Sequence, residues 1–173
     1  MRLTVLMEQT ARGSLEHIHL LSGERLAHKQ GFQNVIGHLR ETLAATEKLQ
    51  PVLAIAEPAL DVVSDVYRRR NRFAHDLLFR NNDDQWTQIR LTDQIKLRQT
   101  KTWDLAGMRE AVLEVVSAQW RLDALYAAIH PLLTGKGLEP GSRDDQIHEG
   151  WLAILHGDFT LTEGGGVRIT GDF

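Results

Sequence analysis

Residues 58–80 of the chain read PALDVVSDVYRRRNRFAHDLLFR. Apolar side chains recur in this stretch at spacings of three and four residues, which is the repeat of a helix that buries one face. Pro58 suits the first position of a helix, because the backbone N–H that proline lacks has no helical partner there. We therefore expect a helix from Pro58 to about residue 79. Its apolar positions are Leu60, Val63, Val66 or Tyr67, Phe73 or Ala74, and Leu77.

Helical patterns also precede this stretch. A set of apolar residues spaced by four, three and four consists of Phe32, Ile36, Leu39 and Leu43. This spacing predicts an amphipathic helix over about residues 30–48, which Pro51 is expected to end. Another helix is expected over about residues 3–21, with Gly13 interrupting its pattern.

The pattern changes after the arginine-rich stretch. An Asn- and Asp-rich loop is expected at 81–84, and alternating residue types then predict a short β-hairpin over 86–98. A long apolar stripe over 105–129 predicts the next helix. The expected ends of this helix are Thr102 or Asp104 as the N-terminal cap and Pro131 as the closing residue.

This order of elements predicts an all-α, up-and-down bundle of four to five helices with a short β-hairpin insertion and an irregular C-terminal tail. We expect the helical domain to span 1–134. Residues 135–173 form a Gly-rich acidic tail that packs on the domain or extends from it. A short helix near 147–155 is expected in the tail, with Trp151 and Leu155 facing inward.

Composition narrows the possible functions. The chain has 173 residues, no cysteine and a net charge of −3, so it offers no disulfide framework and no thiolate chemistry. No apolar run approaches the roughly 20 residues of a membrane span, and the run at 3–7 is too short for an export signal. We expect a cytoplasmic protein without a membrane partner. Any nucleic-acid contact must come from a local basic patch.

One such patch stands out. The segment 68–80 holds five arginines and one acidic residue, Asp76. The arginines are Arg68, Arg69, Arg70, Arg72 and Arg80. In a chain that is acidic overall, this cluster is the natural candidate for phosphate contacts. The structural alternative is a solvated helix face whose arginine stems cover apolar surface.

Within the patch, residues 70–75 read Arg-Asn-Arg-Phe-Ala-His. This segment resembles the Arg-polar-x-x-x-His motif of the HEPN superfamily, helical domains found in toxin ribonucleases, CRISPR-associated RNA nucleases and abortive-infection proteins. The resemblance implies that Arg70, Asn71 and His75 line an active site late in an inner helix of an up-and-down bundle. The order of helices resembles that of the family over about residues 25–131. The resemblance also implies a dimer whose active site is made up of residues from both copies. The tail has no counterpart in it.

The spacing Arg-x4-His alone has little weight, since roughly 0.7 occurrences are expected by chance in this composition. It occurs three times in the chain. In the pair Arg12 and His17, the arginine is followed by a glycine, where the motif needs a polar side chain. The pair Arg143 and His148 lies in acidic surroundings that would repel phosphate. Only Arg70 combines a following Asn with basic neighbours and a helical context.

The chemistry of the three residues fits RNA cleavage. On a helix, Asn71 and His75 are i, i+4 neighbours and Arg70 lies one step around. The 2′-hydroxyl of RNA can attack the adjacent phosphate when a base such as histidine takes its proton and a cation such as arginine neutralises the phosphorane. Asn71 would hold the imidazole tautomer or the scissile phosphate. The reaction needs both a general acid and a general base, but one chain supplies a single motif histidine. Two copies of the chain would supply two motif histidines.

We therefore expect a metal-independent endoribonuclease that leaves a 2′,3′-cyclic phosphate, acts as a toxin or in antiphage or stress defence, and needs no cofactor. Its expected partners are RNA, contacted by Arg68, Arg69, Arg72 and Arg80, a second copy of the chain, and an antitoxin or defence-system protein. Two alternatives stay open. One is an inactive HEPN-like dimer that binds RNA, nucleotide or a protein. The other is an unrelated helical module whose arginine helix faces a partner. Trp103 and Trp120 are expected in the core, and His130 at the surface or as a cap.

Overall fold

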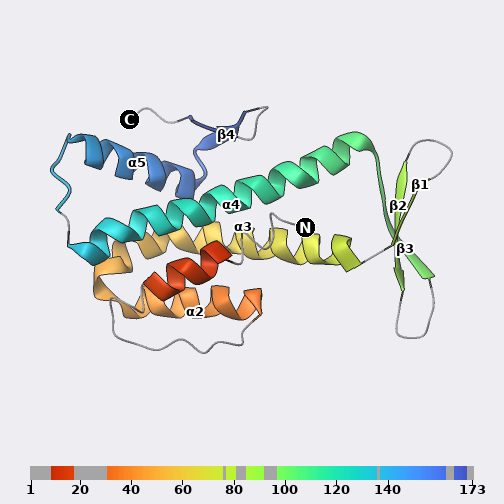
Figure 1. The fold of residues 1–173 in the computed structure, drawn as a ribbon, viewed down its shortest axis with the longest axis horizontal. Helices are drawn as coiled ribbons and strands as arrows, with labels where there is room; N and C mark the ends of the chain where they lie inside the picture. The colour runs from red at the N-terminus through yellow and green to blue at the C-terminus, as the bar shows by residue number, and fades with distance from the viewer. Residues whose placement is uncertain are drawn as a thin grey trace.

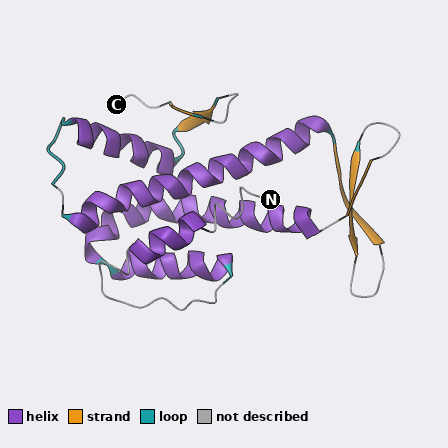
Figure 2. Ribbon diagram, viewed as in Figure 1, coloured by secondary structure: helices purple, strands orange, loops and turns teal. Residues whose placement is uncertain are grey.

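The computed structural model describes residues 9–17, 31–75, 77–80, 85–91, 97–135, 137–162 and 166–170. It is a mostly helical, up-and-down bundle, which confirms the expected fold class (Figures 1 and 2). The helices are a segment over 9–17, α2 (Phe32–Ala45), the short 3-10 helix η1 (Glu47–Leu49), α3 (Gln50–His75), α4 (Leu105–Thr134) and α5 (Arg143–His156). The strands are β1 (Leu77–Arg80), β2 (Trp86–Leu91), β3 (Leu97–Trp103), β4 (Phe159–Leu161) and β5 (Val167–Ile169).

The core lies between α2, α3 and α4, and the segment 9–17 and α5 contribute to it. The spacing predicted for α2 is confirmed, because its apolar set is buried on one face. Leu60 on α3 and Leu125 on α4 are buried in the same cluster as Leu39 on α2. Among the described residues, no helix is both long and apolar enough to span a bilayer.

Helix α3 begins earlier than its prolines indicated. The helix before Pro51 ends at Ala45, ahead of that proline as expected. The expected start of the next helix at Pro58 is wrong, since α3 runs from Gln50 through Pro58 without a break. Pro51 falls in the first turn, where the missing N–H loses nothing. A proline inside a helix costs about 3 kcal/mol. Pro58 is exposed, as is Ala54 one turn earlier, so water can reach the carbonyl left without a partner. Burial of the opposite face offsets the remaining cost.

Helix α4 is capped as expected but ends later. The Asp104 carboxylate accepts a hydrogen bond from the backbone N–H of Gly107 at 2.7 Å, which confirms the predicted N-cap. The expected end at Pro131 is wrong, because the helix continues to Thr134. It stops at Gly135, whose φ of 66° lies in the left-handed region that glycine tolerates best.

The predicted hairpin is confirmed as β2 and β3, and a third strand joins it. The helix expected to reach residue 79 ends instead at His75, and β1 pairs antiparallel with β2 to give the strand order β1-β2-β3. The apolar run at 77–79 suits a helix face and a strand equally well, and pairing with β2 decides between them. The loop expected at 81–84 lies outside the described residues.

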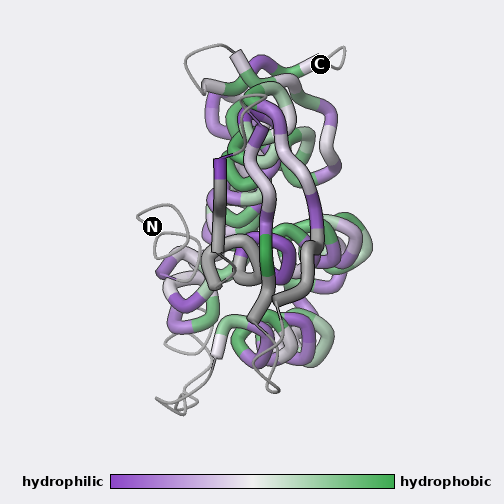
Figure 3. The backbone as a smooth tube through the Cα atoms, turned by 90° about the vertical axis from the view of Figure 1, so that its right-hand side faces the viewer, coloured by the Kyte–Doolittle hydropathy of each residue, from purple (hydrophilic) through white to green (hydrophobic). Residues whose placement is uncertain are grey.

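The sheet stands apart from the core. Helices α3 and α4 extend past the ends of α2 and α5, where they diverge, and the sheet lies beyond their ends (Figure 1). Seen from that end, the three strands stand in front of the helices (Figure 3). The buried residues of α4 lie between Ala118 and Ile129, so residues 105–117 contribute no fully buried side chain, although Val115 packs against the edge of the core. We call residues 68–75 of α3, residues 105–117 of α4 and the sheet the distal arm.

The C-terminal tail packs on the bundle through α5 and then forms the β4–β5 hairpin. The short helix expected near 147–155 is confirmed within α5. Leu155 is 1% exposed in the core, and Trp151 packs against the core partly buried. Arg121 of α4 donates a hydrogen bond to the Leu155 carbonyl at 3.3 Å, which satisfies part of the helix end. Residues of the tail therefore complete the core of the bundle.

Replacing Leu155 by alanine should destabilise the protein by about 2–5 kcal/mol, because it leaves a cavity in the shared core. The matched control is Ile147→Ala on the same helix, where the side chain is 49% exposed and its removal should change stability by less than about 0.5 kcal/mol. Urea denaturation followed by circular dichroism measures both. Equal effects of the two substitutions would contradict the packing of α5 described above.

Candidate active site

The three motif residues lie in the last two turns of α3. His75 is the last residue of that helix, so the backbone between Asn71 and His75 is helical as expected. The side chains of residues 71–75 lie outside the described part of the chain, and Arg70 is the last one described before them. The i, i+4 relation of Asn71 and His75 follows from the helix, and the convergence of the three side chains stays a prediction.

The turn that precedes the motif is fixed to α2. The Ser64 hydroxyl donates a hydrogen bond to Gln33 Oε1 at 2.7 Å, and Gln33 Nε2 donates to the Ser64 carbonyl at 3.2 Å. The ring of Tyr67 stacks on Phe32 with 3.9 Å between the centroids. These contacts fix the rotation of α3 one turn before Arg70, and so they set the direction in which the motif face points.

The arginines of the patch differ in their surroundings. Arg68 pairs with Asp65 at 2.5 Å, and Arg69 pairs with Glu114 of α4 at 3.1 Å. Their side chains are 60% and 59% exposed, and exposed pairs of this kind contribute at most about 1 kcal/mol, so both guanidinium groups can exchange a carboxylate for a phosphate. No described carboxylate lies within ion-pairing distance of half-buried Arg70. The side chain of Arg72 lies outside the described residues.

Arg80 is placed differently from the expectation. It was expected next to the end of the motif helix, but it is the last residue of strand β1, where it is exposed and pairs in register with Trp86. Because α3 ends at His75 and β1 begins at Leu77, the sheet follows the motif almost immediately along the chain. The basic patch therefore continues from the helix onto the sheet.

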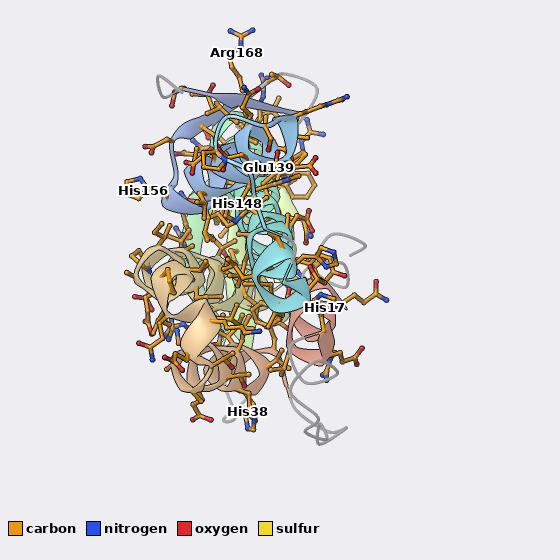
Figure 4. All side chains as sticks on the ribbon, turned by 90° about the vertical axis from the view of Figure 1, so that its left-hand side faces the viewer. His17, His38, Glu139, His148, His156 and Arg168 are labelled. Atoms are coloured by element: carbon orange, nitrogen blue, oxygen red, sulfur yellow. The ribbon has the colours of Figure 1, made fainter. Side chains whose placement is uncertain are left out.

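The other two Arg-x4-His pairs contain histidines that are bonded inside the bundle. His148 Nε2 donates to the Ala128 carbonyl at 3.1 Å, which joins α5 to α4. His17 Nε2 and His130 Nδ1 lie 2.9 Å apart and share one hydrogen bond, with the rings stacked at 5.0 Å. Figure 4 views the end of the molecule opposite the sheet and labels His17 and His148 there, on separate elements. Their contacts give both histidines structural roles.

Potential metal ligands do not gather within the described ranges. No group of three or more histidine, aspartate or glutamate side chains is placed to hold an ion there. His17 and His130 make a pair without a third ligand among the described residues. The described side chains before the motif, those of Arg68, Arg69 and Arg70, are cations of a kind that suits a phosphate group.

A feature missed from the sequence lies on the sheet. Trp103 was expected in the core, but it is only half-buried and does not belong to the buried cluster. Its indole N–H donates to Gln88 Oε1 at 2.9 Å, and the Lys101 ammonium lies 3.6 Å from the ring centroid. The alternating pattern at 86–90 predicted a strand but did not show that Trp103, on the neighbouring strand, lies outside the core. Trp120 does pack against the core, stacked near Trp151.

The chain was also compared with known proteins. No protein-family model, curated protein or solved structure matches it. The candidate site therefore rests on the residues and the geometry described above.

The histidine pair provides a pH-dependent prediction. Burial, and then the charge of His130, hold the pKa of His17 below its usual value of 6.5. In the unfolded chain His17 binds its proton first as the pH falls, so folding stability should decrease between pH 6.5 and the lowered folded pKa. His130→Gln should bring the pKa of His17 part of the way back, because burial remains. NMR titration of the ring protons measures this, and a His17 pKa above 6.5 in the wild-type protein would contradict it.

Proposed function

We propose that the chain is a metal-independent endoribonuclease of the HEPN type. The observation that carries the proposal is the position of the Arg70-Asn71-x3-His75 motif, which ends a helix that projects from the bundle into the basic distal arm. The helical order around the motif and the up-and-down bundle support the same assignment, and the hairpin after the motif is an insertion that such a fold tolerates. A role as a toxin or in antiphage or stress defence is supported by the resemblance of the motif alone.

In the proposed reaction, His75 removes the proton from a ribose 2′-hydroxyl. The freed oxygen attacks the adjacent phosphorus, and the bond from phosphorus to the 5′-oxygen breaks. Arg70 neutralises the negative charge of the pentacoordinate phosphorane, for which the planar guanidinium is suited. The products are a 2′,3′-cyclic phosphate and a 5′-hydroxyl, whose oxygen takes up a proton from a general acid. Asn71 orients the imidazole or the scissile phosphate.

The general acid is proposed to come from a second copy of the chain. One motif supplies one histidine, and two facing motifs supply a base and an acid. The distal arm carries apolar surface that supports this arrangement, since Leu105 is 80% exposed and Val112 is 54% exposed on the part of α4 beside the motif helix. Exposed apolar side chains next to an incomplete site favour a self-complementary contact.

Cleavage should require His75, Arg70 and the 2′-hydroxyl. His75→Ala and Arg70→Ala should each lower the rate by at least about a hundredfold, as expected for loss of a general base or of a charge-stabilising group. Arg70→Lys should fail as well, because an ammonium does not reproduce the bidentate fork. A gel assay of labelled RNA measures this, with DNA of the same sequence and EDTA as further conditions.

The matched controls are His17→Ala and His148→Ala, which alter the other two Arg-x4-His pairs and should keep activity near the wild-type level. Cleavage of DNA, inhibition by EDTA or dependence on His148 would contradict the assignment. RNA binding without cleavage by the wild-type chain would favour the inactive dimer instead.

The proposed dimer should depend on the arm. Light scattering of the wild-type protein at micromolar concentration should give about twice 19.6 kDa. Val112→Arg should shift the mass towards one chain and abolish cleavage together, because a charge in an apolar contact is costly. Ile147→Arg, at a similarly exposed site on α5, is the matched control and should change neither property. A monomer that still cleaves RNA would refute the composite site.

A further inference from the structure

A glutamate of α4 reaches the basic patch of α3. Glu114 Oε1 accepts a hydrogen bond from Arg69 Nη1 at 3.1 Å, so the pair joins the two helices within the distal arm. A carboxylate and a phosphate accept from the same N–H donors of a guanidinium. Glu114 therefore occupies donors of Arg69 that could otherwise contact a phosphate.

The stability of the fold does not explain this ion pair. The side chains of Arg69 and Glu114 are 59% and 39% exposed, and ion pairs in such surroundings contribute little to folding. Buried apolar residues, among them Leu60 of α3 and Leu125 of α4, hold the helices in one core. The Glu114 carboxylate can thus leave the guanidinium and turn to water at small cost.

The position of Arg69 gives the pair a connection to the motif. Arg69 is followed directly by Arg70, which forms no ion pair within the described part of the chain. Neighbouring residues of a chain have their Cα atoms about 3.8 Å apart, and arginine side chains are longer than that. A phosphate held by Arg69 would therefore lie near the phosphate that is proposed to react at Arg70.

The other ion pair of the patch has a local explanation. Arg68 pairs with Asp65, three residues earlier on the same helix, and such pairs are common on helix surfaces. Glu114 comes from α4 and lies 45 residues away along the chain from Arg69. Of these two acidic residues, Glu114 is thus the one that the fold of the arm brings to the patch.

We propose that Glu114 competes with the RNA backbone for Arg69, and that a phosphate of the substrate displaces its carboxylate. A tethered carboxylate has a high effective concentration at its partner, so a free monovalent anion displaces it poorly. An RNA strand displaces it because contacts at the neighbouring arginines hold the strand in place. Glu114 thereby restricts Arg69 to polyanions. This inference rests on the proposed function for the identity of the polyanion as RNA.

Binding can be measured apart from cleavage with a fluorescein-labelled, 2′-O-methylated RNA of about twelve nucleotides, within the usual site size of single-strand binders. Methylation blocks the attacking oxygen, so the wild-type chain can be used. In fluorescence anisotropy, Glu114→Gln should bind about threefold or more tightly than the wild type, because a negative charge beside the phosphate is removed. This gain should shrink as salt is added.

The matched control for charge is Glu110→Gln. Glu110 lies one turn before Glu114 on α4, is exposed, and forms no ion pair within the described part of the chain. The variant changes the net charge by the same amount and should change the affinity less than about 1.5-fold, as expected for a screened surface charge without a partner. An equal gain in both variants would show a general charge effect and would overturn the proposal.

A double-mutant cycle tests whether Glu114 acts through Arg69. Arg69→Gln should weaken binding and lower the logarithmic salt slope by about 0.7, the value for one phosphate contact on a single strand. In the Arg69→Gln background, Glu114→Gln should have no greater effect than Glu110→Gln has. The full threefold gain without Arg69 would overturn the proposal.

A structural role of the pair would give the opposite sign. If Glu114 served to hold α3 in place, Glu114→Gln would lower the melting temperature and weaken RNA binding. Thermal melting followed by circular dichroism is therefore measured for every variant. Weaker binding by Glu114→Gln would refute the competition.

The outcomes separate the two proposals. Tighter binding by Glu114→Gln, with no cleavage of unmodified RNA by the wild type, would remove the proposed ribonuclease and leave the competition at Arg69. Cleavage by the wild type, with unchanged affinity in Glu114→Gln, would remove the competition and leave the ribonuclease. Absence of RNA binding by both proteins would overturn both proposals.

Discussion

The antiparallel packing of α3 against α4 is the contact on which the rest of the structure depends. Leu60 and Val63 of α3 are buried in one cluster with Leu122 and Leu125 of α4, and α2, α5 and the N-terminal segment add their apolar faces to this pair. Both helices are longer than the core that covers them. The excess length carries the motif out of the bundle, and the Arg69–Glu114 pair connects the two helices there. Packing of α3 in the core thus determines where the motif segment at the end of this helix lies.

The sequence predicts those elements whose periodicity is unambiguous. The α2 pattern and the N-cap of α4 are confirmed because each depends on a local rule, one of spacing and one of a carboxylate accepting a backbone N–H. The expected start of a helix at Pro58 and the expected end at Pro131 are wrong because a proline's cost is finite and burial elsewhere on the helix exceeds it. Strand β1 escaped prediction because its identity depends on β2, a partner that no local pattern reveals.

The residues of the candidate site could be predicted from the sequence motif, but their arrangement in space could be predicted only in part. The sequence places Arg70, Asn71 and His75 near the end of a helix, and the helix is confirmed. The dismissal of His17 and His148 rested on their neighbours in sequence, and their hydrogen bonds to His130 and to the Ala128 carbonyl provide a separate physical reason. The position of half-buried Trp103 outside the core was not predictable, since a tryptophan in a strand gives the same pattern whether or not the sheet packs on the core.

The distribution of charge gives the molecule two unlike ends. The tail, residues 135–173, has three basic and seven acidic residues, and α5 packs against the end of the bundle away from the sheet. The arm carries the arginines of α3 and the basic residues of strands β1, β2 and β3, which are Arg80, Arg90, Arg98 and Lys101. The net charge of the chain is −3, so the protein as a whole repels a polyanion. The basic arm would still attract a polyanion, and the acidic tail would orient it by repulsion. Since the favourable potential reaches only about a Debye length, roughly 8 Å at physiological salt, a polyanion would be attracted mainly to the part of the surface that adjoins the motif.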